Sequence, residues 1–163
     1  MHSPLICVMG VSAVGKSTVG SALAAALGVP FVDADNLHPE ANRVKMAAGV
    51  PLTDEDRWPW LDLVGENLQA SADTGLVMAC SALRRMYRDR IRAAAPEVIF
   101  VHLHGSRDLL LSRAQGRTDH FMPASLLDSQ LETLEDLDAD ESGLAVTVDR
   151  EAALLVEKIV GRL

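Results

Sequence analysis

Short apolar runs alternate along the chain with segments in which apolar residues recur at helical spacing. Five runs have the length of buried strands: Leu5–Met9, Pro30–Val32, Leu76–Ala79, Val98–Leu103 and Ala145–Val148. The segments that follow them predict helices: Lys16–Leu27, Pro39–Ala48, Leu83–Ala94, Arg107–Arg113 and Glu151–Leu163. Because strands that alternate with helices form a parallel sheet covered on both faces, the pattern predicts a three-layer α/β fold with a five-stranded parallel sheet.

Two longer stretches without a predicted strand interrupt this alternation, at residues 33 to about 74 and about 114 to 143. Insertions of this length in a compact domain usually carry function or form a lid. The chain has 163 residues, which fits one domain. We therefore expect a single domain, residues 1–163, whose specific function lies in these two stretches.

Charge and cysteine content narrow the classes of protein. The chain has 15 Lys and Arg against 23 Asp and Glu, a formal net charge of −8, which argues against coating nucleic acid or an anionic membrane. Cys7 and Cys80 lie far apart and form no disulfide or metal signature. The first residues lack the basic region of a signal peptide, and no apolar run approaches the roughly 18 residues of a membrane helix. We expect a cytoplasmic protein that binds neither nucleic acid nor membrane.

One glycine-rich motif follows the first strand. Gly10-Val11-Ser12-Ala13-Val14-Gly15-Lys16-Ser17 fits the phosphate-loop pattern Gly, four residues, Gly-Lys-Ser/Thr. Backbone amides of this loop and the amino end of the helix bind phosphates, so we expect residues 10–18, ending at Thr18, to hold a nucleotide. Lys16 is expected to span the β- and γ-phosphates of ATP, and the Ser17 hydroxyl to bind Mg²⁺.

The loop alone does not separate a kinase from an ATPase, a GTPase or a nucleotide-gated binding module. No Asn-Lys-x-Asp guanine-reading motif is present, which weakens the GTPase. The third strand ends in Cys80-Ser81 with no acidic residue, which weakens the motor ATPases.

Two carboxylates, Asp33 and Asp35, follow the second strand. If this segment is extended, both side chains point the same way and can face the γ-phosphate. Asp33 is then a ligand toward the metal, and Asp35 can orient an acceptor hydroxyl and accept its proton. The alternative is a polar strand end or a helix cap.

Blocks of residues beyond the phosphate loop resemble the gluconokinase family. They are Asp33-Ala34-Asp35-Asn36-Leu37-His38-Pro39, Asn42, Lys45-Met46, Gly49, Pro51-Leu52, Asp54, Asp56-Arg57, Pro59-Trp60-Leu61, Ala79-Cys80-Ser81-Ala82-Leu83, Tyr87-Arg88-Asp89, His120-Phe121-Met122-Pro123, Leu127, Ser129-Gln130 and Thr133-Leu134-Glu135. The resemblance implies the P-loop fold of small nucleoside-monophosphate-type kinases, with an acceptor-binding insertion and a lid. It further implies transfer of the ATP γ-phosphate to the 6-hydroxyl of D-gluconate, and it is compatible with a homodimer.

Gluconate carries one carboxylate and several hydroxyls, so its site needs cations and hydrogen-bonding groups. The residues expected to bind it, besides Asp35, are His38, Lys45, Arg57, Ser81 and Arg84. Arg57 and Arg84 suit the carboxylate because a guanidinium can donate two parallel hydrogen bonds. Lys45 and Arg84 are equally well explained as solvated surface charges.

The expected lid, at about residues 114–123, contains basic residues. Arg117 is expected at the transferring phosphoryl group, where it would stabilise charge once the lid closes. Arg113 is assigned to nucleotide contact or lid anchoring, and His120 either contacts gluconate or caps the following helix. A basic surface loop is the alternative.

Two positions depart from the family pattern. Ala13 stands where a glycine is more usual, which matters if residue 13 needs a positive φ, and Asp119 places a negative charge near the incoming phosphates. In the segment Trp58-Pro59-Trp60, Pro59 is expected in the first turn of a helix, Trp60 as a packing anchor for Arg57, and Trp58 as more exposed.

The sequence thus predicts a magnesium-dependent gluconokinase in which Lys16, Asp35 and Arg117 are catalytic. A kinase of shikimate or nucleotide type shares Lys16, Ser17 and the Asp-x-Asp strand end. A nucleotide-gated binding protein without turnover is the rival of another class.

Overall fold

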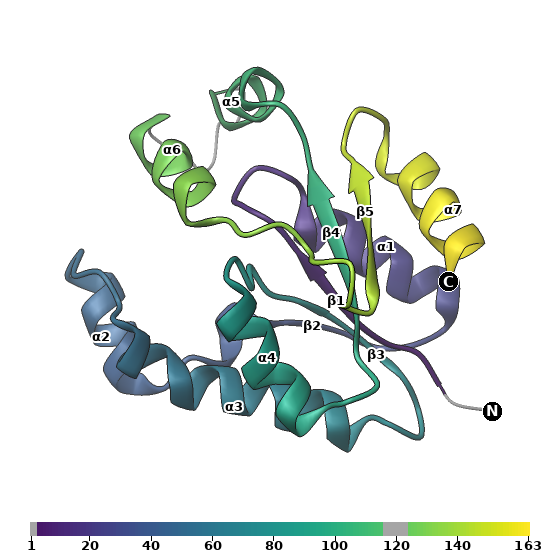
Figure 1. Ribbon diagram of the computed structural model, residues 1–163, viewed down its shortest axis with the longest axis horizontal. Coiled ribbons are helices and arrows are strands. Elements are labelled where there is room, and N and C mark those ends of the chain that lie inside the picture. The colour runs from purple at the N-terminus through teal and green to yellow at the C-terminus, as the bar shows by residue number, and fades with distance from the viewer. Residues whose placement is uncertain (1–2, 116–123) are drawn as a thin grey trace.

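The computed structural model describes residues 3–115 and 124–163. Its five strands form one parallel sheet in the order β2-β3-β1-β4-β5 (Figure 1). The strands are β1 (Leu5–Met9), β2 (Phe31–Asp33), β3 (Leu76–Ala79), β4 (Ile99–His104) and β5 (Gly143–Thr147). The helices are α1 (Lys16–Leu27), α2 (Glu40–Ala47), α3 (Asp54–Ala70), α4 (Arg85–Ala94), α5 (Arg107–Gln115), α6 (Ala124–Thr133) and α7 (Ala152–Arg162), with a 3₁₀ turn at Ala34–Leu37. The five-stranded parallel sheet is confirmed.

Element bounds agree best for the fully buried strands β1 and β3 and for α1, which lies between Gly15 and Gly28. β1, β3 and α1 begin and end at the predicted residues, whereas β2, β4 and β5 shift by one or two residues. The sequence predicted a helix at Pro59 but gave no bounds for it, and α3 is that helix. It begins at Asp54 because Thr53 and Asp56 form a capping box, in which each side chain accepts the other residue's backbone N–H. Pro59 therefore lies inside the helix, and its expected place in the first turn is wrong.

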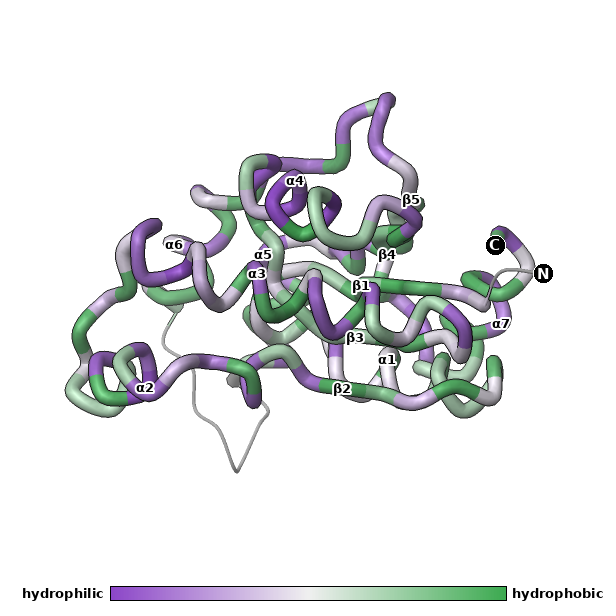
Figure 2. Tube along the Cα trace, turned by 90° about the horizontal axis from the view of Figure 1, so that it is seen from below, coloured by the Kyte–Doolittle hydropathy of each residue, from purple (hydrophilic) through white to green (hydrophobic). Residues whose placement is uncertain are grey.

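Apolar side chains of the central strands point alternately to two helical layers. Ile6 and Val8 of β1 belong to the core under α1 and α7, whereas Cys7 and Met9 belong to the core under α3 and α4. Figure 2 shows the hydrophobic colour along β1 and β3 in the middle of the molecule. The strands are hydrophobic on both faces because helices cover both.

The carboxyl ends of the strands meet at one edge of the sheet. β1 lies in the centre, paired with β3 on one side and β4 on the other, and the helix after β1 (α1) and the helix after β3 (α4) cover opposite faces of the sheet. In open parallel sheets ligands bind outside the carboxyl ends of the strands at such a point. Within the described ranges, no helix combines the length and apolar character needed to cross a membrane.

Candidate active site

The loop after β1 has the backbone geometry of a phosphate-binding loop. Gly10 has φ 148°, and a Cβ built there would lie 2.5 Å from the carbonyl oxygen of Leu103 on β4, so only glycine fits. Gly15 has φ 86° and precedes the first residue of α1, Lys16. The Lys16 Nζ donates hydrogen bonds to the carbonyl oxygens of Gly10, at 2.9 Å, and Val11, at 3.1 Å. The lysine is thus folded over the loop.

Ala13, which stands where the family pattern more often has a glycine, has a positive φ. Its φ is 75°, in the left-handed region that disfavours any residue with a Cβ. The loop therefore carries backbone strain that a glycine there would not.

A cavity of about 300 Å³ opens between the phosphate loop and the ends of β2 and β3. It is lined by Ser12, Ala13, Gly15, Lys16, Ser17, Thr18, Asp33, Asp35, Ala79, Cys80, Ser81 and Gln130. The structure thus brings six of the predicted nucleotide-binding residues to one space, together with both carboxylates and the predicted acceptor residue Ser81.

The two carboxylates reach this cavity by a route other than the one expected. The Asp33 Oδ1 accepts the backbone N–H of Asp35 at 3.0 Å, which begins the 3₁₀ turn instead of continuing the strand. The expectation of an extended Asp33–Asp35 segment is wrong, because an aspartate that accepts the amide two residues on favours a turn. The other Asp33 oxygen, Oδ2, accepts a hydrogen bond from the Ser17 hydroxyl at 3.0 Å.

Among the described residues, the remaining acceptor candidates do not line this cavity. His38 is 8% exposed and stacks on Trp60 with ring centroids 4.2 Å apart, and its burial lowers the pKa of the imidazole. Trp60 is buried and donates from Nε1 to the carbonyl of Ala34 at 2.8 Å, while Trp58 is more exposed, as expected. Lys45 forms an ion pair with Asp56 at 2.7 Å. His38 and Lys45 thus have structural partners in place.

One of the two predicted arginine clamps, Arg57, contacts the carboxylate of Asp54. Arg57 Nη1 lies 3.2 Å from Asp54 Oδ1, and the Tyr87 hydroxyl donates to the same oxygen at 2.6 Å. The Tyr87 hydrogen bond, with the charges of Arg57 and Arg84, holds the pKa of Asp54 below its usual value. The guanidinium of Arg57 also lies 5.5 Å from the centroid of the Tyr87 ring. Sequence reasoning assigned no role to Asp54 or Tyr87, although both lie in the family-like blocks.

A second cavity of about 300 Å³ lies on the opposite side of the phosphate loop, beside the start of α7. Arg113 and Arg150 line it together with Thr18. Arg113 donates to the carbonyl oxygen of Val148, at the end of β5, at 2.5 Å. Either predicted role of Arg113, nucleotide contact or lid anchoring, fits this position. Arg117, Asp119 and His120 fall outside the described residues, as does most of the expected lid.

Comparisons with known proteins agree with this geometry. The model of the shikimate kinase family matches residues 12–152. A gluconokinase of Gluconobacter oxydans is 46% identical, over 95% of this chain and 88% of that protein. A probable gluconokinase of Xenopus tropicalis is 43% identical, over 98% of this chain and 93% of that protein.

This chain belongs to the gluconokinase family.

A solved structure of a gluconokinase from Sinorhizobium meliloti 1021 superposes with a TM-score of 0.88 at 50% identity, covering 97% of this chain and 90% of that one. The fold is therefore the P-loop kinase fold predicted from the sequence. As a gluconokinase-family member, the protein is an ATP-dependent phosphotransferase.

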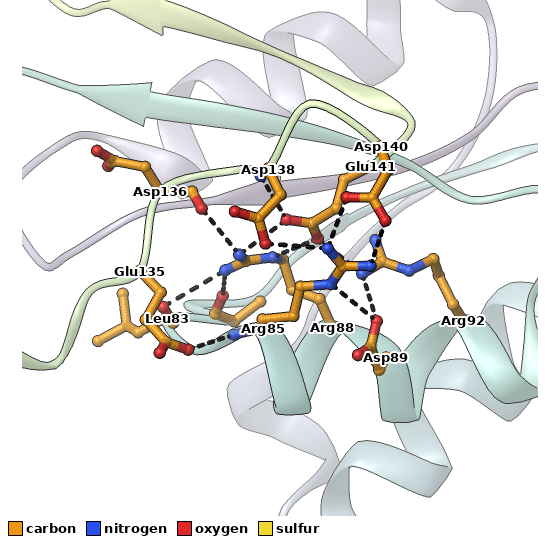
Figure 3. A network of polar contacts seen from close by, with 11 residues as sticks. Leu83, Arg85, Arg88, Asp89, Arg92, Glu135, Asp136, Asp138, Asp140 and Glu141 are labelled. Carbon is orange, nitrogen blue, oxygen red and sulfur yellow. Dashed lines mark hydrogen bonds and ion pairs between the residues drawn. The ribbon is translucent and has the colours of Figure 1, made fainter.

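In this gluconokinase-family chain, an ion-pair network supports the loop that carries Ser81 (Figure 3). Arg88 of α4 is fully buried and makes two hydrogen bonds to Glu141, at 2.7 and 3.0 Å. Its Nη1 also donates to the carbonyl of Ala82 at 2.9 Å, where the backbone has φ 44°. Nearer the solvent, Arg85 pairs with Asp138 and Asp140 at 2.9 and 2.7 Å. The network joins α4 to residues 135–141 and holds the Ser81 loop between them.

Proposed function

We propose that this chain transfers the γ-phosphoryl group of ATP to the 6-hydroxyl of D-gluconate, giving 6-phospho-D-gluconate and ADP. The observation that carries the proposal is the cavity in which Lys16 of the phosphate loop, Asp35 and Ser81 meet. Proteins named gluconokinase that are 46% and 50% identical over nearly the whole chain support gluconate as the acceptor.

In the proposed mechanism, the loop amides and Lys16 bind the ATP phosphates. Asp35 orients the 6-hydroxyl and accepts its proton as the hydroxyl oxygen bonds to the γ-phosphorus. The bond between that phosphorus and the β–γ bridging oxygen breaks, and ADP leaves. The Ser81 hydroxyl donates a hydrogen bond to a gluconate hydroxyl or accepts one from it. Arg57 and Arg84 bind the gluconate carboxylate.

The residues beside the loop also suit Mg²⁺. The Ser17 hydroxyl and Asp33 Oδ2 lie 3.0 Å apart at the edge of the cavity, and oxygen ligands of this kind are those that Mg²⁺ takes in phosphate sites. When bound, the ion would neutralise charge on the transferring group.

Three further parts of the proposal come from the sequence. Residues 1–163 form one kinase domain, with an acceptor region at about 33–74 and a lid at about 114–123 that brings Arg117 to the phosphates. The protein is cytoplasmic, and a homodimer stays a prediction.

Substitution of Asp35 by asparagine tests the mechanism. Asp35→Asn keeps the size of the side chain but removes the base, so kcat with gluconate should fall by about 100-fold or more. ATP affinity should stay within a few-fold of the wild-type value. The exposed Asp73→Asn is the matched control and should leave kcat unchanged. An Asp35→Asn variant with wild-type kcat would show that Asp35 is not the base.

A coupled assay for ADP across several acceptors tests the substrate. Gluconate should release ADP much faster than shikimate or nucleoside monophosphates do. Faster turnover of shikimate would show that the acceptor is shikimate and not gluconate, in line with the shikimate kinase family model that matches residues 12–152. ATP binding without acceptor-dependent ADP release would indicate a nucleotide-gated binding protein.

A further inference from the structure

Gln130 lies on α6, 118 residues from the phosphate loop in sequence, but its side chain contacts the loop. Its Oε1 accepts the backbone N–H of Ser12 at 2.6 Å, and the residue lines the cavity between the loop and the acceptor carboxylates. This is the cavity in which the proposed reaction takes place. The mechanism above gives Gln130 no part.

The carboxamide of Gln130 has a second end that this contact does not use. Its oxygen is committed to Ser12, and a side-chain amide has two N–H donors on the neighbouring nitrogen. Within the part of the chain that the structure describes, Nε2 has no protein hydrogen-bond partner although the side chain is partly buried. A donor held in this way beside a phosphate loop suits an anionic oxygen in the cavity.

We propose that Gln130 contacts the substrate: its Oε1 holds the Ser12 amide, and its Nε2 donates a hydrogen bond to an oxygen of the ATP γ-phosphoryl group. This inference rests on the proposed kinase function. Donors fixed in advance at the transferring group stabilise the charge that develops there. A neutral amide can donate to the phosphoryl oxygen without forming an ion pair with Asp33 or Asp35. An arginine at the same place would form such a pair.

The helix that carries Gln130 is held from the acceptor side as well. Just after α6, the backbone N–H of Glu135 donates to the carbonyl of Leu83 at 2.6 Å. The Glu135 side chain accepts the backbone N–H of Arg85, at the start of α4, at 2.7 Å (Figure 3). Because Leu83 lies two residues after Ser81, these bonds fix α6 relative to the loop that carries Ser81. Gln130 is therefore positioned by both sides of the cavity, as a group that must be precise requires.

Two substitutions separate a donor from a residue that only holds the loop. Gln130→Glu keeps an oxygen for the Ser12 amide but replaces the donor by a second acceptor. Gln130→Met has nearly the same length and loses both functions. Ser129→Glu, at an exposed position of the same helix, is the control for added negative charge.

The measurements are the affinities for ADP and for the β,γ-imido analogue of ATP, without any acceptor, followed by kcat with ATP and gluconate. For Gln130→Glu we expect affinity for the imido analogue to fall by about 10-fold or more, with ADP affinity within about three-fold of the wild-type value. The kcat should fall by about 100-fold. Gln130→Met should weaken the imido analogue too, and Ser129→Glu should change neither ligand.

Two results would overturn the proposal. Wild-type affinity and kcat in Gln130→Glu, with losses only in Gln130→Met, would mean that Gln130 merely holds the loop. Equal weakening of ADP and the imido analogue would mean that no contact is specific to the γ-phosphoryl group. The binding measurements contain no gluconate, so they test Gln130 even if gluconate proves not to be the acceptor.

Discussion

The two sides of the cavity are built by different interactions. The phosphate side consists of β1, the phosphate loop and α1, where the geometry comes from the backbone and from an apolar core around Val14 and Leu23. The acceptor side consists of α2, α3, α4 and residues 134–142, where arginine–carboxylate pairs gather. Arg57–Asp54, Arg88–Glu141 and Arg90–Asp62 all lie on this side.

This difference between the two sides predicts which property of the protein a substitution on each side will change. On the phosphate side the expected ligand contacts are mostly backbone amides, so exchanging a side chain should act on chemistry or on loop strain. On the acceptor side the charged side chains proposed to bind a sugar acid, such as Arg57, also form ion pairs between or within the helices. Stability, pH dependence and substrate affinity should therefore be linked on the acceptor side and largely separate on the phosphate side.

Replacement of the buried Arg88 should lower the free energy of unfolding more than any other substitution proposed here. Arg88→Met leaves the buried carboxylate of Glu141 with Arg92, at 2.6 Å, as its remaining charged partner; removing one member of a buried ion pair typically costs about 3–5 kcal/mol. The free energy of unfolding, from urea denaturation, should fall by that amount. The control is Arg85→Met on the same helix, whose ion pairs are partly exposed to solvent and should contribute at most about 1 kcal/mol each.

A double variant shows whether the lost charge compensation of Glu141 is the cause. Arg88→Met combined with Glu141→Leu removes both charges of the pair and leaves Arg92 paired with Asp89, and apolar replacements of a buried pair are often close to neutral. The double variant should therefore regain much of the lost stability. If it is as unstable as Arg88→Met, the hydrogen bond from Arg88 to Ala82 is the more important contact.

The same contrast explains how much of the site could be predicted. β1, β3 and α1 were predicted to the residue, because fully buried strands and a glycine-bounded helix are determined by nearby residues. The start of α3 was missed although Thr53 and Asp56 have the capping-box spacing, since Pro59 drew attention to a later start. The turn at Asp33 was expected only as the alternative, a helix cap, because an aspartate side chain can either end a strand or cap a turn.

Contacts between distant segments could not be predicted. Nothing near Gln130 in the sequence indicates that its side chain reaches the amide of Ser12. The pairing of Arg88 with Glu141 likewise depends on how α4 and residues 135–141 pack. The roles of Asp35 and Arg57 in the reaction stay predictions that the variants test, and the role of Lys16 also stays a prediction.

Acid should destabilise the acceptor side first. Burial alone would raise the pKa of Glu141, but hydrogen bonds from Arg88, the Asp138 amide and Arg92 lower it to about 2. Its ordinary value is about 4.5. A carboxyl with a lowered pKa in the folded state stabilises the protein above the unfolded-state pKa. That stabilisation should be lost as the pH falls from about 4.5 to about 2.

Thermal unfolding followed between pH 7 and pH 2 measures this loss. Wild-type protein should lose stability steeply below about pH 4.5, and the double variant of Arg88 and Glu141 should lose less over the same range. Equal slopes for the two proteins would assign the acid sensitivity to other carboxyls, of which Asp56 also has a pKa lowered to about 2, chiefly by its hydrogen bond from Lys45.

A smaller effect is expected for substrate affinity at Arg57. Arg57→Ala removes one proposed partner of the gluconate carboxylate, so the KM for gluconate should rise by about 10-fold or more, since hydrogen bonds to charged groups contribute roughly 1.5–3 kcal/mol. The KM for ATP should not change. Arg90→Ala, which breaks an exposed pair with Asp62 on the same helix pair, is the control. An unchanged KM for gluconate in Arg57→Ala would leave Arg57 with only its role beside Asp54 and Tyr87.

The smallest effect, and the one with the opposite sign, is expected at Ala13. Because its φ of 75° disfavours a residue with a Cβ, Ala13→Gly should raise the free energy of unfolding by about 1 kcal/mol. Ala25→Gly, at an exposed position of α1, should lower it by a similar amount, since glycine weakens a regular helix. The same replacement then has opposite effects 12 residues apart, which only a backbone difference can explain. If both variants are destabilised alike, the loop is not strained at Ala13 in solution, and backbone geometry contributes less to the phosphate side than we infer.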